Sequence, residues 1–218
     1  MSPVPENVAR YRAQYRQTEI GARYRGALHL AFTLSFGLGG MAFCILRIEQ
    51  PTALEWLAVP LTFLYANLAE YWGHRVPMHR PLPGLGLVYR RHAGQHHRFF
   101  TDVAMPLEGW RDLKAVLFPP LLMSFFFTLF ALPVGLVLAL VFSPNVGYLF
   151  AATALGYFLN YEILHLAYHL PEQHPLARVP LIPTLRRLHH RHHDPSLMTT
   201  RNFNITYPIC DWLFRTLT

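Results

Sequence analysis

The chain has 218 residues, of which 52% are hydrophobic and only 14% are charged, whereas soluble domains average roughly 25% charged residues. This balance argues against a soluble globular protein. The 14% aromatic content argues against a disordered chain, and two cysteines, Cys44 and Cys210, are too few for a disulfide scaffold. The class that remains is a small all-α membrane protein with 13 histidines.

Four apolar segments are expected to cross a membrane, because a helix of about 20 apolar residues spans the hydrocarbon core. The first is 27–46 and the second is 53–72. The block 115–161 contains no Lys, Arg, Asp or Glu and is long enough for two further spans. Its break is expected either at Pro133 or at Pro144.

The basic residues indicate which side of the membrane each segment faces. Of 19 Lys and Arg residues, only Arg47 falls in a loop between the first two or the last two spans. The positive-inside rule therefore places both termini and the central segment in the cytoplasm. The predicted single domain consists of an N-terminal arm, spans 1–2, a cap segment, spans 3–4 and a second cap segment, at residues 1–26, 27–74, 75–112, 113–169 and 170–218.

The formal net charge of +7 and the pI near 9.7 do not indicate a nucleic-acid partner. The basic residues flank membrane spans, where anionic headgroups attract them. Arginine outnumbers lysine by 18 to one, which suggests a GC-rich bacterial genome. We therefore expect the bacterial inner membrane rather than the endoplasmic reticulum.

Ten of the 13 histidines lie in the cap or at the cytoplasmic ends of the spans. They form four groups: His74 and His79; His92, His96 and His97; His165 and His169; and His189, His192 and His193. The other three, His29, His174 and His190, are expected to be polar side chains near the membrane interface.

Residues three or four positions apart share a face of an α-helix. This spacing predicts three aligned sets: His92 with His96, His165 with His169, and His189 with His192 and His193. Pro77 stands between His74 and His79. There we expect the helix to end and the chain to bend, bringing the second ring round to the first.

Crowding so many imidazoles together is unfavourable unless the rings are neutral and coordinate something. Metal binding meets both conditions. A structural zinc ion takes four ligands and a catalytic one usually three, so ten rings are too many for one ion. Two ions would receive about five nitrogens each, leaving a position on each for oxygen, water or a bridging group. Imidazole suits iron, copper and zinc, whereas haem ligands would be expected within the spans.

Two carboxylates are candidates to support the metal ligands. Glu70 precedes His74 by one helical turn, and Glu162 precedes His165 by three residues. Each could accept a ring N–H and fix the tautomer of a ligand. An acidic residue inside a membrane span is also a candidate functional group.

The order and spacing of the histidine groups resemble the fatty acid hydroxylase and sterol desaturase superfamily of integral-membrane di-iron oxygenases, over roughly residues 60–217. Residues around the histidine groups also match the family: Tyr71-Trp72 with His74-Arg75, Tyr161-Glu162 before His165, Asn202-Phe203, and Asp211-Trp212-Leu213-Phe214. The chain departs from the usual family sequence at two positions, Arg215 and Asn204, where many members have glycine. Both lie outside the histidine groups and bear on the subfamily and the substrate.

The resemblance implies four transmembrane helices under a cytosolic cap, with two iron ions held by the ten histidines. It also implies O2 as co-substrate for hydroxylating a C–H bond of a fatty acyl, sterol or related hydrophobic chain, or for desaturating it. The chain has no flavin or nicotinamide motif and too few cysteines for an iron–sulfur cluster. An external electron donor of the cytochrome b5, ferredoxin or rubredoxin type is therefore implied.

A lipid substrate would reach the metals from the bilayer through an apolar groove between spans. Possible lining residues are Phe99, Phe100, Trp110, Phe125, Phe126 and Phe127. Two other functions are open. A zinc-dependent membrane hydrolase would need fewer ligands, and the His-Glu-x-x-His motif does not occur. A metal-storage or transport protein would place ligands along a path through the membrane.

Overall fold

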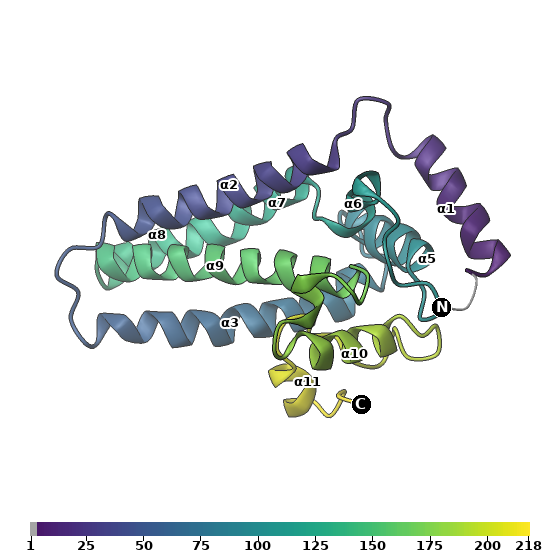
Figure 1. The fold of residues 1–218 in the computed structure, drawn as a ribbon. Helices are drawn as coiled ribbons and strands as arrows, with labels where there is room; N and C mark the ends of the chain where they lie inside the picture. Colours follow the sequence, from purple (N-terminus) through teal and green to yellow (C-terminus); the bar gives the residue numbers. More distant parts are fainter. Residues whose placement is uncertain (1–3) are drawn as a thin grey trace.

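The computed structural model describes residues 4–218, so residues 1–3 of the predicted N-terminal arm lie outside it. The described chain is helical, and its only β pairing is an isolated bridge between Thr101 and Ala104. The predicted all-α class is therefore confirmed. Long helices lie side by side as an elongated bundle, and most of the short helices and both described ends gather at one end of it, which we call the cap (Figure 1).

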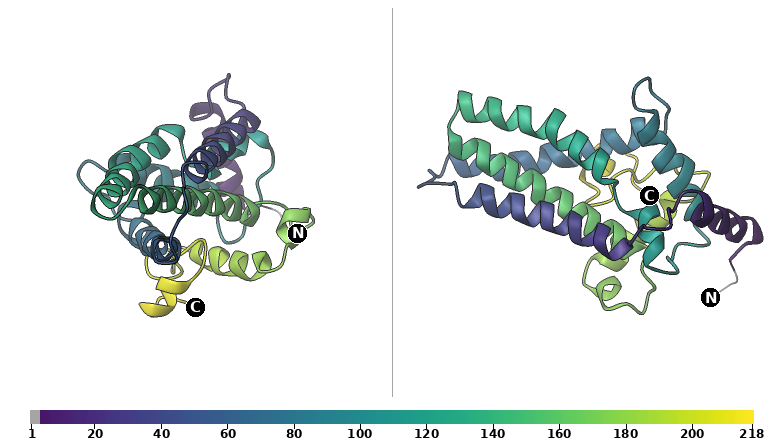
Figure 2. Two further views of the ribbon diagram at one scale, coloured as in Figure 1. Left: turned by 90° about the vertical axis from the view of Figure 1, so that its left-hand side faces the viewer. Right: turned by 90° about the horizontal axis from the view of Figure 1, so that it is seen from above.

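Four helical segments build the bundle. They are α2 (Gly26–Ile45), α3 (Ala58–Gly73), the continuous run of α7 (Pro120–Phe126), η5 (Phe127–Ala131) and α8 (Leu132–Val141), and α9 (Pro144–Tyr168). The views from the end and from above show the same four segments side by side (Figure 2). The break in the long uncharged block falls at Pro144, the first residue of α9, whereas Pro133 lies inside the third segment after the π-helical turn η5.

The remaining elements are short, and most of them belong to the cap. They are α1 (Glu6–Thr18), η1 (Glu55–Leu57), η2 (His74–Met78), α4 (Gly86–Tyr89), η3 (Arg90–His96), α5 (His97–Phe99), η4 (Trp110–Asp112), α6 (Leu113–Val116), η6 (Pro175–Arg178), α10 (Ile182–His192) and α11 (Ile209–Leu213). Two of them, η2 and η3, are π-helical and carry predicted metal ligands.

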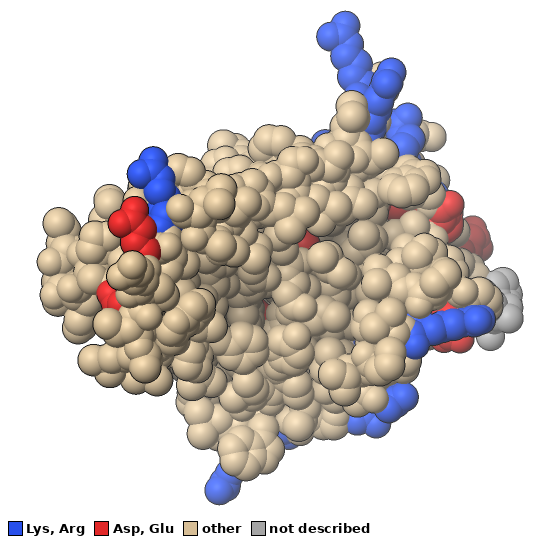
Figure 3. Space-filling model, turned by 60° about the vertical axis from the view of Figure 1, so that its left-hand side comes forward, with Lys and Arg blue, Asp and Glu red and all other residues tan. Residues whose placement is uncertain are grey.

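Two helical segments, Gly26–Ile45 and Trp110–Val141, are long and apolar enough to cross a membrane, and little of their surface is buried. The bundle surface in Figure 3 is almost free of charged atoms, which lie at its margins. Such a large exposed apolar surface is suited to lipid. The protein is therefore membrane-associated. Helix α3 has only 16 residues, and α9 includes Asn160, Glu162 and His165, so neither predicted span stands out by length and composition.

Helix α9 is the centre of the bundle, because it packs against α2, α3 and α8. Its contact with α2 depends on small residues, which let helix backbones approach closely. A Cβ atom added at Gly37 would lie 2.4 to 2.7 Å from three side-chain atoms of Leu159. Leu159 is itself only 5% exposed, so it has little room to move away.

We expect Gly37→Ala to lower the free energy of unfolding by about 1–3 kcal/mol, the usual cost of overpacking a filled core. Gly39→Ala is the matched control, because a Cβ at Gly39 meets no atom within 4 Å, and replacing a helical glycine gains stability. Thermal unfolding in detergent compares the two variants. Equal midpoints would show that the α2–α9 contact does not require a glycine.

Candidate metal centre

All ten histidines of the predicted ligand groups lie at one place, where the cap meets the bundle, and none is more than 8% exposed. Their ring nitrogens form two clusters. The first cluster contains His74, His79, His92, His97 and His192. The second contains His96, His165, His169 and His189, and it includes His193, whose Nε2 atom lies 3.0 Å from Nε2 of His189 and 3.2 Å from Nε2 of His96.

The Nε2 atoms within each cluster have the spacing of ligands around an ion. In the first cluster, Nε2 of His92 lies 2.8 Å from that of His74 and 3.0 Å from that of His97. In the second, the Nε2 atoms of His96 and His165 are 3.2 Å apart. An ion bound to two nitrogens at about 2.1 Å each and at a right angle holds them about 3.0 Å apart. Each cluster therefore offers five nitrogens suited to one ion.

The π-helical turns distribute the ligands differently from the predicted α-helical alignment. His92 lies with His97 in the first cluster, and His96 lies in the second. The rings of His92 and His96 do align, stacked with their centroids 5.2 Å apart, but the two residues serve different clusters. The reason is that η3 closes i→i+5 hydrogen bonds, which bring residues five apart, such as His92 and His97, together. His74 and His79 are paired in the same way, since η2 continues through Pro77 instead of ending there.

Helices α9 and α10 follow the α-helical spacing more closely. His165 and His169 of α9 both belong to the second cluster, as predicted. His189 and His193, four apart, also belong to it, whereas His192 reaches the first cluster, with its Nε2 atom 3.0 Å from that of His79. Helix α10 therefore runs between the clusters and contributes to both. The excluded His29, His174 and His190 join neither cluster.

Backbone carbonyls orient five of the rings. In the first cluster, Nδ1 of His74 donates to the carbonyl oxygen of Phe203, and Nδ1 of His192 donates to that of Arg201 at 2.9 Å. In the second cluster, the acceptors are the carbonyl oxygens of Ala115 for His96, Met105 for His169 and Phe100 for His193, at 2.8, 3.0 and 2.7 Å. A proton held on Nδ1 leaves the lone pair of Nε2 free to bind a metal ion.

The predicted direct contact of Glu70 and Glu162 with the ligand rings is wrong. Glu70 accepts hydrogen bonds from the amides of Ile205 and Thr206 at 2.5 and 2.9 Å, and from the hydroxyl of Tyr157 at 2.5 Å. Glu162 accepts one from the amide of Phe118 at 3.1 Å. The backbone amides are the donors within reach of each carboxylate. The two carboxylates therefore fix the backbone, and backbone carbonyls orient the rings.

Four of the five orienting carbonyls, those of Phe100, Met105, Arg201 and Phe203, lie in irregular segments, and that of Ala115 lies in α6. Glu70 and Asp211 hold the segment that carries Phe203, because Asp211 accepts hydrogen bonds from the amides of Phe203 and Asn204 at 2.9 and 2.6 Å. Every residue has a carbonyl, so no residue type marks these acceptors. The sequence matched Asn202-Phe203 and Asp211 to the family, but it did not predict that this segment orients ligand rings.

Burial keeps the rings neutral. It lowers the pKa of His96 to about 3 and that of His192 to about 4. Burial, together with the charges that neighbouring rings would carry, lowers the pKa values of His97 and His193 well below their usual value. Neutral imidazole is the form that binds a metal ion, so the site is prepared for coordination at neutral pH.

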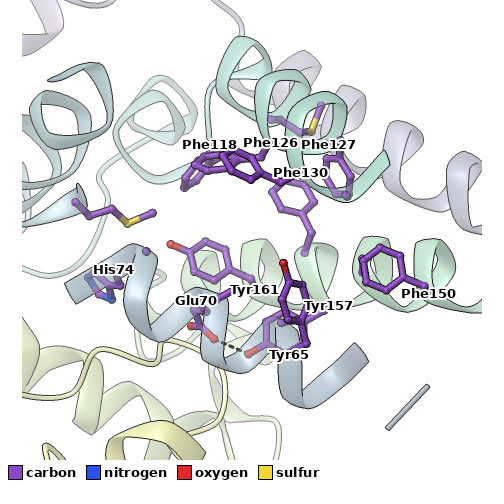
Figure 4. Close-up of a pocket in the computed structure, with 18 residues that line it drawn as sticks. Tyr65, Glu70, His74, Phe118, Phe126, Phe127, Phe130, Phe150, Tyr157 and Tyr161 are labelled. Atoms are coloured by element: carbon purple, nitrogen blue, oxygen red, sulfur yellow. Dashed lines mark hydrogen bonds between the residues drawn. The ribbon is translucent and has the colours of Figure 1, made fainter. Parts of the chain in front are cut away.

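An apolar cavity of about 390 Å³ opens beside the first cluster between α3, α7, η5 and α9. Figure 4 shows four phenylalanines along one side of the cavity, with His74, Glu70 and Tyr157 on the other; the four are Phe118, Phe126, Phe127 and Phe130. This is the apolar groove expected between the spans. Of the residues predicted to line it, Phe126 and Phe127 do so.

The other predicted lining residues lie elsewhere. Phe99 and Phe100 are fully buried in the cap core, and Trp110 is exposed. Phe125 is not among the residues around the cavity. The sequence showed aromatic residues near the spans but not which side of each helix faces α3 and α9.

A small chamber of about 30 Å³ lies against both clusters, and a water molecule needs about 10–15 Å³ of such space. It is lined by His92 of the first cluster and by His96 and His165 of the second. Met78, Phe118 and Tyr161 border both this chamber and the apolar cavity. The chamber can hold a molecule of two or three atoms next to both groups of nitrogens and next to a hydrophobic chain.

An all-helical, membrane-associated protein with an apolar cavity beside two buried histidine clusters that could bind metal has the features of a membrane enzyme with a lipid substrate. The model of the fatty acid hydroxylase family matches residues 59–216. The chain belongs to this family, which confirms the resemblance found in the sequence and implies oxidation of a lipid of the hydroxylase or desaturase type. No curated protein and no solved structure matches the chain.

The metal-free protein should lose stability as the pH falls below about 6.5, the pKa of histidine in an unfolded chain. The folded pKa values of His96 and His192 are lowered to about 3 and 4, so the unfolded chain binds protons first and the loss continues down to these values. Each such ring costs about 1.4 kcal/mol per pH unit. Thermal unfolding between pH 8 and pH 5 measures the effect, and a flat midpoint would contradict neutral burial.

Proposed function

We propose that the protein is a non-haem di-iron oxidoreductase that uses O2 to hydroxylate a C–H bond of a lipid. The observation that supports this most directly is the small chamber that borders histidines of both clusters and adjoins an apolar cavity. All ten predicted histidines are the proposed ligands, five for each ion. Bound iron would supply the redox chemistry with O2.

The residues of the chain fit such a pair of ions. The donors in both clusters are neutral nitrogens, and five rings are held with Nε2 directed inward. Imidazole is a suitable iron ligand. The three rings whose Nδ1 atoms have no partner in the described chain, those of His79, His97 and His189, would have their tautomer fixed by coordination through Nε2 itself.

The substrate is proposed to be a fatty acyl, sterol or related hydrophobic chain lying in the apolar cavity. Apart from Glu70, His74 and the tyrosine hydroxyls, the cavity is lined by apolar side chains. These side chains exclude water from the reacting carbon and hold the chain along α9 toward Tyr161 and the chamber. The family description favours hydroxylation, and desaturation of the same chain is the alternative outcome.

The proposed topology has four spans with both termini and the cap in the cytoplasm, in a bacterial inner membrane. Four bundle segments of similar extent, and described ends that both lie at the cap, support it. Electrons would come from a separate donor of the cytochrome b5, ferredoxin or rubredoxin type, since the chain carries no sequence motif for a redox cofactor of its own. This donor would reach the clusters from the cap side.

Oxygen labelling tests the proposed reaction. Lipids from cells that make the protein are compared with lipids from cells that lack it, under 18O2 and in H2 18O. We expect an added hydroxyl that takes its oxygen from O2. Oxygen from water would indicate a zinc-dependent hydrolase, and Mössbauer spectra of the 57Fe-grown protein should show two bound iron ions.

Histidine variants connect this reaction to the clusters. His96→Ala and His192→Ala should each abolish product and reduce bound metal, because each removes a nitrogen from a different cluster. His190→Ala is the control on the same helix, since its ring belongs to neither cluster. If all three variants behaved alike, the assignment of ligands would be wrong.

A further inference from the structure

A second large hollow lies on the cap side, away from the apolar cavity. It is a groove of about 690 Å³ between the α1–α2 connection, η3 and the start of α7. Five cations line this basic groove: Arg23, Arg25, Arg90, Arg91 and Lys114. Its only carboxylate is Glu19, which accepts a hydrogen bond from Gln95 at 3.0 Å. The groove therefore carries four more positive than negative side chains.

None of these five cations is neutralised within the described chain. The ion pairs among residues 4–218 use Arg10, Arg12 and Arg16 instead. In the groove, Arg91 donates to the hydroxyl of Tyr15 at 2.8 Å, and the amine of Lys114 lies over the ring of Tyr24. A concave surface with this uncompensated charge attracts an anion.

The surroundings of the basic groove indicate what kind of anion it would bind. Gly26 begins α2 and Pro120 begins α7, so the groove lies where two bundle helices start. Leu28 and Leu121 line the groove and are exposed. Positive charge beside exposed apolar side chains matches an anionic lipid. At the surface of a membrane, the charged headgroup of such a lipid lies next to its acyl chains.

The ligand of this groove would be separate from the substrate in the apolar cavity. Arg91 and Pro119 border both the groove and the small chamber, and the chamber borders the cavity. The chamber, however, has only about 30 Å³ of space, too little for a lipid chain to pass. We propose that the basic groove binds the phosphate headgroup of an anionic phospholipid, whose acyl chains lie against Leu28 and Leu121.

Short-chain lipids test this site on the detergent-solubilised full chain. Dihexanoyl phosphatidylglycerol is expected to bind at least about tenfold more tightly than dihexanoyl phosphatidylcholine. The double variant Arg23→Gln/Arg25→Gln should weaken binding of the first lipid by about tenfold or more, since it removes two cations that attract the headgroup. Isothermal titration at low and high salt should show that the preference declines with ionic strength.

The control is Arg178→Gln/Arg187→Gln, which removes two exposed cations elsewhere on the cap and should leave binding unchanged. Equal binding of the two lipids, or equal loss in the control, would overturn the proposal. Inorganic phosphate that binds as tightly as phosphatidylglycerol would overturn the lipid as the source of the phosphate. The test measures binding alone, so its result does not depend on the proposed reaction.

A second inference concerns Arg12 of α1, which lies outside the residues that match the family and is only 1% exposed. Its Nε atom donates to the carbonyl of Phe99 at 2.8 Å, and a terminal nitrogen donates to the carbonyl of Ala104. Its other terminal nitrogen pairs with Glu108 at 2.7 Å. Arg12 therefore joins both ends and the middle of the segment that follows α5.

The same segment orients the second cluster. The carbonyl of Phe100, next to Phe99, accepts from His193, and the carbonyl of Met105, next to Ala104, accepts from His169. We infer that Arg12 is a positioning residue for the metal ion of the second cluster. This inference rests on the proposed function, because it assumes that the cluster binds an ion.

Metal retention under chelator tests Arg12→Met against the two-ion wild-type protein. Loss of a supporting contact typically costs about 10- to 100-fold in metal affinity, so the variant should lose one ion and keep the other. The Mössbauer spectrum of the remaining 57Fe should match that of His96→Ala, which lacks a nitrogen of the same cluster. Arg16→Met is the matched control, because Arg16 pairs with Glu108 and Asp112 but donates to no carbonyl.

Retention of both ions, or their equal loss, would overturn the role of Arg12. If Arg12→Met does not fold, Arg12→Lys keeps the buried charge but lacks the fork of donors and should lose the same single ion. Retention of both ions by Arg12→Lys would then overturn the inference. A wild-type protein without bound metal would instead refute the proposed function.

Discussion

The structure depends on keeping ten buried imidazoles neutral and pointing one nitrogen of each inward. Burial supplies the neutrality, because a charged ring would lose its hydration and face its neighbours. Direction needs an acceptor for the other nitrogen, and five backbone carbonyls provide it. Helix α9 and the short elements η2, η3, α5 and α10 bring the rings together, and the chain around them supplies the carbonyls.

The two clusters are supported by different parts of the chain. Residues 201–206 orient rings of the first cluster and are held by Glu70 and Asp211. The segment after α5, together with α6, orients rings of the second and is held in part by Arg12 of α1. The two clusters are therefore supported by separate segments of the chain, although α10 contributes histidines to both.

The sequence identified the all-α class, the ten converging histidines and their division into two groups of about five. It did not identify the members of each group, because an α-helical spacing was applied to η3, which is π-helical. At His74 and His79 a bend at Pro77 was expected, whereas η2 continues through Pro77. Carboxylates were expected to orient the rings, since side chains can be read from a sequence, whereas a carbonyl such as that of Phe203 cannot. The apolar cavity was expected, but its lining depends on how each helix is rotated about its axis.

The π-helical form of η3 has a consequence for how this part of the chain can vary. A π turn carries one more residue than the α-helical turn it replaces. Deleting a single residue between His92 and His96 would restore α-helical winding but turn the later rings of this segment, His96 and His97, away from their clusters. Substitutions at Ala93 or Gly94 leave the spacing unchanged, so the two clusters constrain the length of this segment more strictly than its composition.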